Sequence, residues 1–314
     1  MDNTDLRPLG AGEILDRAVT LYVRRFVAIV SVLAVVTVPL LLIEMLVAPG
    51  RVQVFADLGG LLQAGGDPGK VRAATAAVMR DSHWTGTLLG FNLGAAIVRV
   101  LMWNALLVVV ASAHGGLRTA LGDAYFRAAR CWLAQLVVAV VYVALAAIAA
   151  VPLLLAYLAV IVVVIGVSFT HSVPLTATVG IVLGVALLAV AVGVMAWLLM
   201  AYELAAVAVA TETSNPVTAV ETALRRALGR TTRWRTLLAG LVLLAVIYGA
   251  AIPIGIAAAL VGLVAHEPVL TVAVTGVGNV VLEGLTAAFV VVFALDVRVR
   301  REGLDLAALV EAPA

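Results

Sequence analysis

Charged side chains are scarce in this chain of 314 residues. Asp, Glu, Lys and Arg together make up 12% of it, whereas hydrophobic residues make up 64%. Soluble domains hold roughly 25% charged and about 45–50% apolar residues. Because a soluble fold cannot bury so large an apolar excess, the composition excludes an ordinary soluble domain and indicates a membrane protein.

Cysteine and lysine are almost absent. Cys131 is the only cysteine, so the chain can form neither an internal disulfide nor a thiolate metal cluster, and we expect a small buried residue there. Lys70 is the only lysine among 20 basic residues. Together with the Ala and Val content, this suggests a bacterial genome rich in G and C. A polar stretch, residues 1–25, comes first instead of a signal peptide, so the first apolar run should stay as a helix.

Six apolar runs are long enough to cross a bilayer, since a spanning helix needs about 20 mainly apolar residues. They occupy residues 26–48, 87–113, 132–151, 178–203, 237–265 and 270–295. The third run begins an uncharged stretch, 132–168, which is interrupted by Pro152 and could be one long tilted helix or a helix followed by a broken piece. The predicted fold class is an all-α polytopic membrane helix bundle with about six transmembrane helices and short interfacial amphipathic helices.

The distribution of basic residues predicts the orientation, because cytoplasmic loops of membrane proteins hold an excess of Arg and Lys. With the N-terminus inside, 15 of the 20 basic residues fall on the cytoplasmic side. We therefore expect a multi-pass protein of the bacterial inner membrane with both termini in the cytoplasm. Its expected parts are an N-terminal helix (1–25), a membrane domain (26–297) with an outer loop (49–86) and cytoplasmic loops (114–131 and 204–236), and a basic tail (298–314).

Three cytoplasmic segments are expected to form amphipathic helices that end in basic and aromatic anchors. Two of them cover residues 12–25 and 119–130, and the third begins at Asn215 and Pro216, a favourable N-cap and N1 pair. Such helices lie in the headgroup region with the apolar face down and Arg near phosphate. The apolar faces of the first and third are Ile14, Ala18, Leu21 and Tyr22, and Val217, Val220, Leu224 and Leu228. The chain could thus be three repeats of interfacial helix plus membrane hairpin.

Three stretches carry a resemblance to a known family. They are LRPLGAGEILDR at residues 6–17 with LYVRRF at 21–26, the segment 216–234 with its Ala-Leu-Arg-Arg core, and the tail DVRVRREGLDL at 296–306. Together they resemble the bacterial glycerophosphoryl diester phosphodiesterase membrane domain family. The family often has tyrosines before the Asp, where this chain has Ala294 and Leu295.

The resemblance implies a helical membrane domain, and most stand-alone members of the family have no assigned activity. Its name comes from members that are joined to a soluble phosphodiesterase. That enzyme needs a His-Arg-Gly opening, a Glu-x-Asp metal pair and a further His, which do not occur in this sequence. We therefore do not transfer the phosphodiesterase activity.

Charged residues inside spans cost roughly 2.5–3.5 kcal/mol each to insert and are functional candidates. Arg99 and Glu283 both lie about 18–20 Å from the outer ends of their spans, at a rise of about 1.5 Å per residue, so we predict that they pair. Asn92 and Asn279 precede them and extend the polar seam. The pair is either a fixed bridge that sets helix packing or a proton or substrate site.

Glycine and the tail also carry packing signals. Two GxxxG patterns, Gly90 with Gly94 and Gly180 with Gly184, permit close helix contact.

If the last span continues as a helix, we expect three ion pairs at i,i+4 spacing. They are Asp296 with Arg300, Arg298 with Glu302 and Arg301 with Asp305.

The sequence favours a non-catalytic membrane module over an enzyme. The four histidines lack the spacing of a helical metal site, and no phosphate loop or nucleophile elbow occurs. We expect no catalytic residue, metal or cofactor, and no nucleic acid partner. The expected partners are anionic lipid headgroups and a membrane or cytoplasmic protein, and the alternative is a transporter with a midplane site at Arg99 and Glu283. The expected anchor residues are Arg24, Arg25, Trp132, Arg225, Arg226, Trp234, Asp296, Arg298, Arg300 and Arg301.

Overall fold

A computed structural model gives the fold and describes residues 9–47, 69, 72, 86–117, 119–169, 173–265 and 268–302. Within these ranges the chain is helical and contains no strand. The outer loop expected at 49–86 lies outside the described residues apart from positions 69, 72 and 86, and so does the tail from residue 303 onward. The helices are α1 (Ala11–Arg24), α2 (Phe26–Val47), α5 (Gly86–His114), α6 (Leu121–Ser168), α7 (Val173–Thr211), α8 (Pro216–Leu228), α9 (Arg233–Ala265) and α10 (Pro268–Glu302).

Six of the described helices are long and apolar enough to span a membrane, namely α2, α5, α6, α7, α9 and α10. The predicted all-α membrane fold is thereby confirmed. The two interpretations of residues 132–168 are also resolved, because α6 is one continuous helix of 48 residues that runs through Pro152. At about 1.5 Å per residue it is about 72 Å long, more than twice the roughly 30 Å of a hydrocarbon core.

The chain packs into two compact units. Unit 1 comprises Met1–Trp132 and Val246–Val292, and unit 2 comprises Leu133–Ala245 and Phe293–Ala314. The division passes through α6, α9 and α10, so each of these helices contributes one part to each unit.

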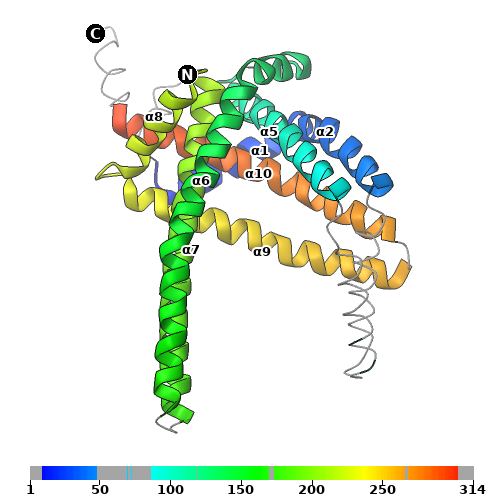
Figure 1. The fold of residues 1–314 in the computed structure, drawn as a ribbon. Helices are drawn as coiled ribbons and strands as arrows, with labels where there is room; N and C mark the ends of the chain where they lie inside the picture. The colour runs from blue at the N-terminus through cyan, green and yellow to red at the C-terminus, as the bar shows by residue number, and fades with distance from the viewer. Residues whose placement is uncertain are drawn as a thin grey trace. The chain divides into compact units, whose positions relative to one another are not determined.

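In unit 1, α2 packs along α5, and the first turns of α6 dock on both (Figure 1). Three hydrogen bonds hold that docked segment to backbone carbonyls. Tyr125 donates to Val32 at 2.7 Å. The Asn104 amide donates to Ala128 at 3.3 Å, and the Trp132 indole donates to Ile97 at 3.3 Å. Trp132, expected to be a membrane anchor, therefore serves the packing of unit 1.

The predicted apolar face of α1 is packed against protein instead of lying in the headgroups. Ile14, Ala18 and Tyr22 are buried, and a Cβ atom placed on Gly284 of α10 would lie 2.7 Å from Tyr22 and equally close to Ile29. Glycine at position 284 thus lets α10 approach α1 and α2 closely, which explains why the interfacial placement of this face was wrong. Burial raises the pKa of the Tyr22 hydroxyl.

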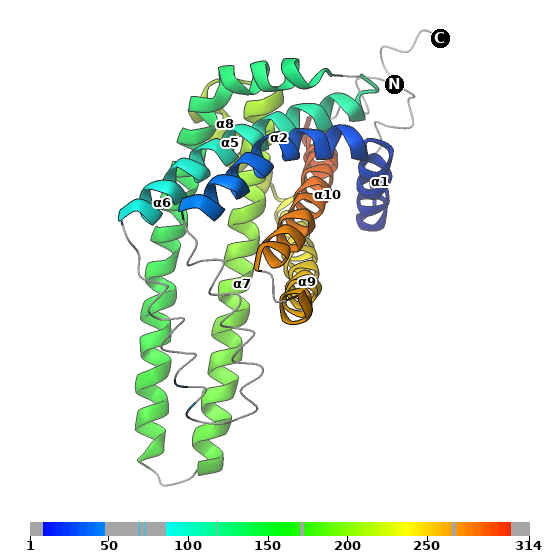
Figure 2. The same ribbon diagram turned by 90° about the vertical axis from the view of Figure 1, so that its right-hand side faces the viewer.

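In unit 2, α6 and α7 form a long antiparallel hairpin, seen side by side in Figure 2. Near its tip, the Cβ position of Gly180 lies 3.5 Å from Val164. Towards its other end, the rings of Tyr142 and Tyr202 meet edge to face with centroids 5.8 Å apart. The two contacts share one antiparallel register, so the helices stay paired along this length.

The closest helix crossing in unit 2 is at Gly240, where α9 lies directly on the backbone of α7. A Cβ atom at Gly240 would lie 2.1 Å from the carbonyl oxygen of Ala196. The GxxxG interpretation was wrong in this respect, because Gly90, Gly94 and Gly184 have nothing within 4 Å of a Cβ position. The GxxxG spacing did not identify Gly240, which is the glycine that the close crossing of α7 and α9 requires.

We expect Gly240→Ala to destabilise the protein by about 1–3 kcal/mol, because the added methyl group would force α9 away from α7. Gly184→Ala is the matched control and should cause no loss, since Ala is the better helix former and the site is open. Thermal unfolding of the purified proteins in one detergent measures both. Equal unfolding temperatures for the two variants would contradict the close crossing.

Candidate functional site

Charged side chains from several helices converge in unit 2 at what we call the basic end. It comprises the C-terminal end of α7 with Glu212, helix α8, the first turns of α9, and the last turns of α10. Its central residue is Asp296, whose carboxylate is completely buried. Arg235 of α9 donates to it at 3.1 Å, and Arg300 of α10 donates at 2.9 Å. The pair expected between Asp296 and Arg300 is therefore present, and the arginine of α9 joins it.

A second ion pair ties α8 to the end of α7. Arg226 donates to both carboxylate oxygens of Glu212, at 2.8 and 2.9 Å, and only 7% of its side chain is exposed. Arg298 approaches the same carboxylate at 3.9 Å. Arg226 was expected at the lipid surface, and that placement was wrong because Glu212 draws the side chain into the protein.

The remaining links of the basic end use backbone groups. Arg301 donates to the carbonyl of Arg225 at 2.9 Å, and the Thr232 hydroxyl donates to the carbonyl of Arg226. Gly229 fits beneath them, since a Cβ there would lie 2.6 Å from the Thr232 oxygen. The pairs of Arg298 with Glu302 and of Arg301 with Asp305 involve side chains outside the described residues.

Helix α8 has two faces with different surroundings. Asn215 caps it by accepting from the backbone amide of Val217 at 3.0 Å, as its sequence predicts. The side that packs on the protein, including α7, carries Ala219, Ala223 and Ala227 together with Arg226. The two ends of the predicted apolar face are exposed, Val217 by 72% and Leu228 by 62%, whereas Val220 and Leu224 between them are half-buried. Arg225 is on the exposed side and pairs with Glu221 at 2.5 Å.

Removal of the buried carboxylate in Asp296→Ala should cost about 3 kcal/mol or more, because it leaves two arginines without their acid in a partly desolvated place. Glu221→Ala is the control: it breaks an exposed pair on one helix and should cost about 0.5 kcal/mol or less. Denaturant or thermal unfolding of both variants gives the comparison. A cost for Asp296→Ala no greater than that for Glu221→Ala would show that the buried cluster does not hold the fold.

The intramembrane residues Arg99 and Glu283 lie in unit 1, on α5 and α10. Arg99 is exposed on α5, and Glu283 is half-buried on α10. Among the described residues no ion pair joins the two side chains. The predicted direct bridge is therefore not formed.

The expected polar seam does not extend further in the described part of unit 1. Asn92 is half-buried and Asn279 is exposed, and neither has a hydrogen bond to Arg99 or Glu283 there. Arg24 is exposed and Arg25 is half-buried at the end of α1.

Sequence reasoning missed a buried polar group in unit 2. Gln135 of α6 is fully buried and lies beside the Tyr202 hydroxyl, although its amide atoms make no hydrogen bond of normal geometry within the described residues. Glu212 was missed as well, because its 14-residue separation from Arg226 follows no helical spacing.

A double-mutant cycle of Arg99→Ala and Glu283→Ala measures the attraction between the two charges. We expect a coupling of about 0.5–1 kcal/mol, at the low end for interacting residues because the groups are not in contact. Unfolding of the two single variants and the double variant in the same detergent provides the cycle. Strictly additive losses would mean that the attraction is negligible.

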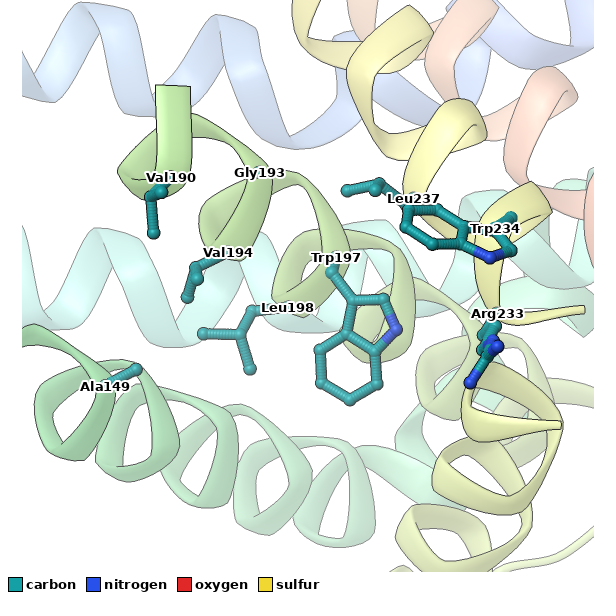
Figure 3. A pocket seen from close by; sticks show the side chains of 9 residues that line it. All are labelled: Ala149, Val190, Gly193, Val194, Trp197, Leu198, Arg233, Trp234 and Leu237. Carbon is teal, nitrogen blue, oxygen red and sulfur yellow. The ribbon is translucent and has the colours of Figure 1, made fainter. Parts of the chain in front are cut away.

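Unit 2 also holds a cavity of about 590 Å³ between α6, α7 and the start of α9 (Figure 3). Its walls are mostly apolar, and Arg233 is its only charged lining residue. Neither Arg99 nor Glu283 lines it. Among the described residues, no group of three His, Cys, Asp or Glu side chains could hold a metal ion.

Comparison with known proteins adds no assignment to these sites. No family model matches the chain, and no curated protein or solved structure is similar to it. The resemblance to the phosphodiesterase membrane domain family therefore stays a prediction.

Proposed function

We propose that the chain is a non-catalytic integral membrane module of a bacterial inner membrane, which anchors partner proteins or anionic lipid at its basic end. In this proposal the basic end and both termini face the cytoplasm. The observation that carries it is the buried Asp296 carboxylate, which ties α9 to α10 through Arg235 and Arg300. A bundle held by lipid-facing apolar helices does not need this desolvated charge cluster.

The cluster supports a docking role because it neutralises its own charges and fixes the groups around it. With Arg226 held by Glu212, α8 is locked on α7 and presents its other side outward. That side combines Val217 and Leu228 with the charge of Arg225. A rigid apolar and basic surface of this kind suits the headgroup region of an anionic leaflet or a protein docked there.

The transporter alternative keeps one observation in its favour. Arg99 and the half-buried Glu283 both lie inside candidate membrane spans, and charged residues at such depth often mark substrate or proton paths. The cavity in unit 2 does not reach either residue, whereas the buried charge cluster at the basic end directly supports the module. We therefore favour the module.

Labelling of single cysteines tests the orientation. In a Cys131→Ser background, Thr231→Cys at the exposed start of α9 should react with a membrane-impermeant maleimide only after spheroplasts are lysed. Phe169→Cys, at the exposed far end of α6, is the matched control and should react in intact spheroplasts. The reverse pattern would place the basic end outside.

Flux measurements separate the module from the transporter. Proteoliposomes that contain the full chain and a trapped pH dye should dissipate a pH gradient no faster than vesicles without protein. A faster dissipation that Glu283→Gln abolishes, and that Glu221→Gln leaves intact, would overturn the module in favour of a proton-coupled carrier.

A further inference from the structure

The cavity in unit 2 is amphipathic along its length. Figure 3 shows Arg233 and Trp234 at one end and Val190 and Ala149 at the other, with the Trp197 ring between them. One end therefore offers a guanidinium group and indole N–H donors, and the other offers only hydrocarbon. At about 590 Å³ the volume falls within the roughly 300–1,000 Å³ of small-molecule sites.

Arg233, unlike Arg226 and Arg235, has no acidic partner among the described residues. Arg226 binds Glu212, and Arg235 binds Asp296. Within the described residues Arg233 makes no ion pair, and its guanidinium lies 6.0 Å from the ring centre of Trp234. An anion at this end of the cavity would meet a cation that is not already neutralised by the protein.

The cavity opens sideways towards the surroundings of the helices. Two of its lining residues, Val190 and Trp234, are 56% and 64% exposed, and the α7 and α9 helices that carry them are both candidate membrane spans. Trp side chains concentrate at the membrane–water boundary. A ligand would therefore enter from the bilayer, with its polar part at the level of the two tryptophans.

We infer that this cavity binds one anionic phospholipid, with the phosphate at Arg233 and an acyl chain lying along Trp197, Val194 and Val190. Charge complementarity selects the lipid, since the lining contains one cation, no acid and otherwise apolar walls. Arginine binds phosphate through several N–H donors at once, which favours a phosphate headgroup over a neutral one. The inference rests on the proposed function in placing the basic end at the leaflet that holds anionic lipid.

Fluorescence quenching tests the site on the full chain in detergent micelles. The probe is phosphatidylglycerol with brominated acyl chains, which quench tryptophan on contact, and brominated diacylglycerol, which has no phosphate, is the neutral comparison. We expect a saturable quenching component that Trp197→Phe removes. Arg233→Gln should raise the half-saturating concentration of phosphatidylglycerol about fivefold, the loss expected for one arginine near an anionic headgroup, and leave that of diacylglycerol unchanged.

Two further variants make the result decisive. Arg230→Gln removes an exposed charge that does not line the cavity and should titrate like the wild type. Gly193→Leu adds a side chain to the cavity wall beside Leu237 and should abolish the saturable component for both lipids. Identical titrations of Arg233→Gln and Arg230→Gln, or full binding by Gly193→Leu, would overturn the inference. These readouts do not involve the outer face of α8 or Glu283, so a failed lipid site is distinguishable from a failed module.

Discussion

The packing of unit 2 depends on one buried carboxylate. Asp296 has no exposed side-chain surface and accepts hydrogen bonds from Arg235 and Arg300. Burial of a carboxylate is costly unless the group is paired and hydrogen-bonded, so the contact of Arg235 with Asp296 holds α9 against α10, while Arg300 supplies the second partner. The pair of Arg226 with Glu212 extends the same constraint to α8 and α7. The ends of four helices are thereby held in one arrangement.

This constraint determines which side chains remain available at the basic end. Because the arginines of α8 and α10 are largely engaged within the protein, positive charge alone does not describe the surface that a partner meets. The available groups are apolar or mixed: Val217 and Leu228 on α8, and Trp234 with Arg233 beside the cavity. Arg226, Arg235 and Arg300 thus serve the packing of the protein. Arg233, which lies close to them in the sequence, remains available to a lipid.

The fold class and six spans follow from the sequence because apolar length and arginine placement are local signals. The cap at Asn215 and the pair of Asp296 with Arg300 were predictable for the same reason, since capping and i,i+4 spacing involve neighbouring residues. The pairing of Glu212 with Arg226 and the close approach at Gly240 depend on how helices meet, which no spacing rule contains. Arg99 and Glu283 show the limit most clearly: their equal depth led to the prediction of a bridge, but no ion pair joins them among the described residues.

The central claim is that Asp296 holds the helix ends at the basic end together. Hydrogen exchange by mass spectrometry on the full chain in detergent tests it most directly by comparing the wild type with Asp296→Ala. The account predicts slow exchange across α8 and the first turns of α9 in the wild type, and a loss of that protection in the variant, while α2 and α5 stay unchanged. Protection of α8 and α9 that is the same in both proteins would contradict it.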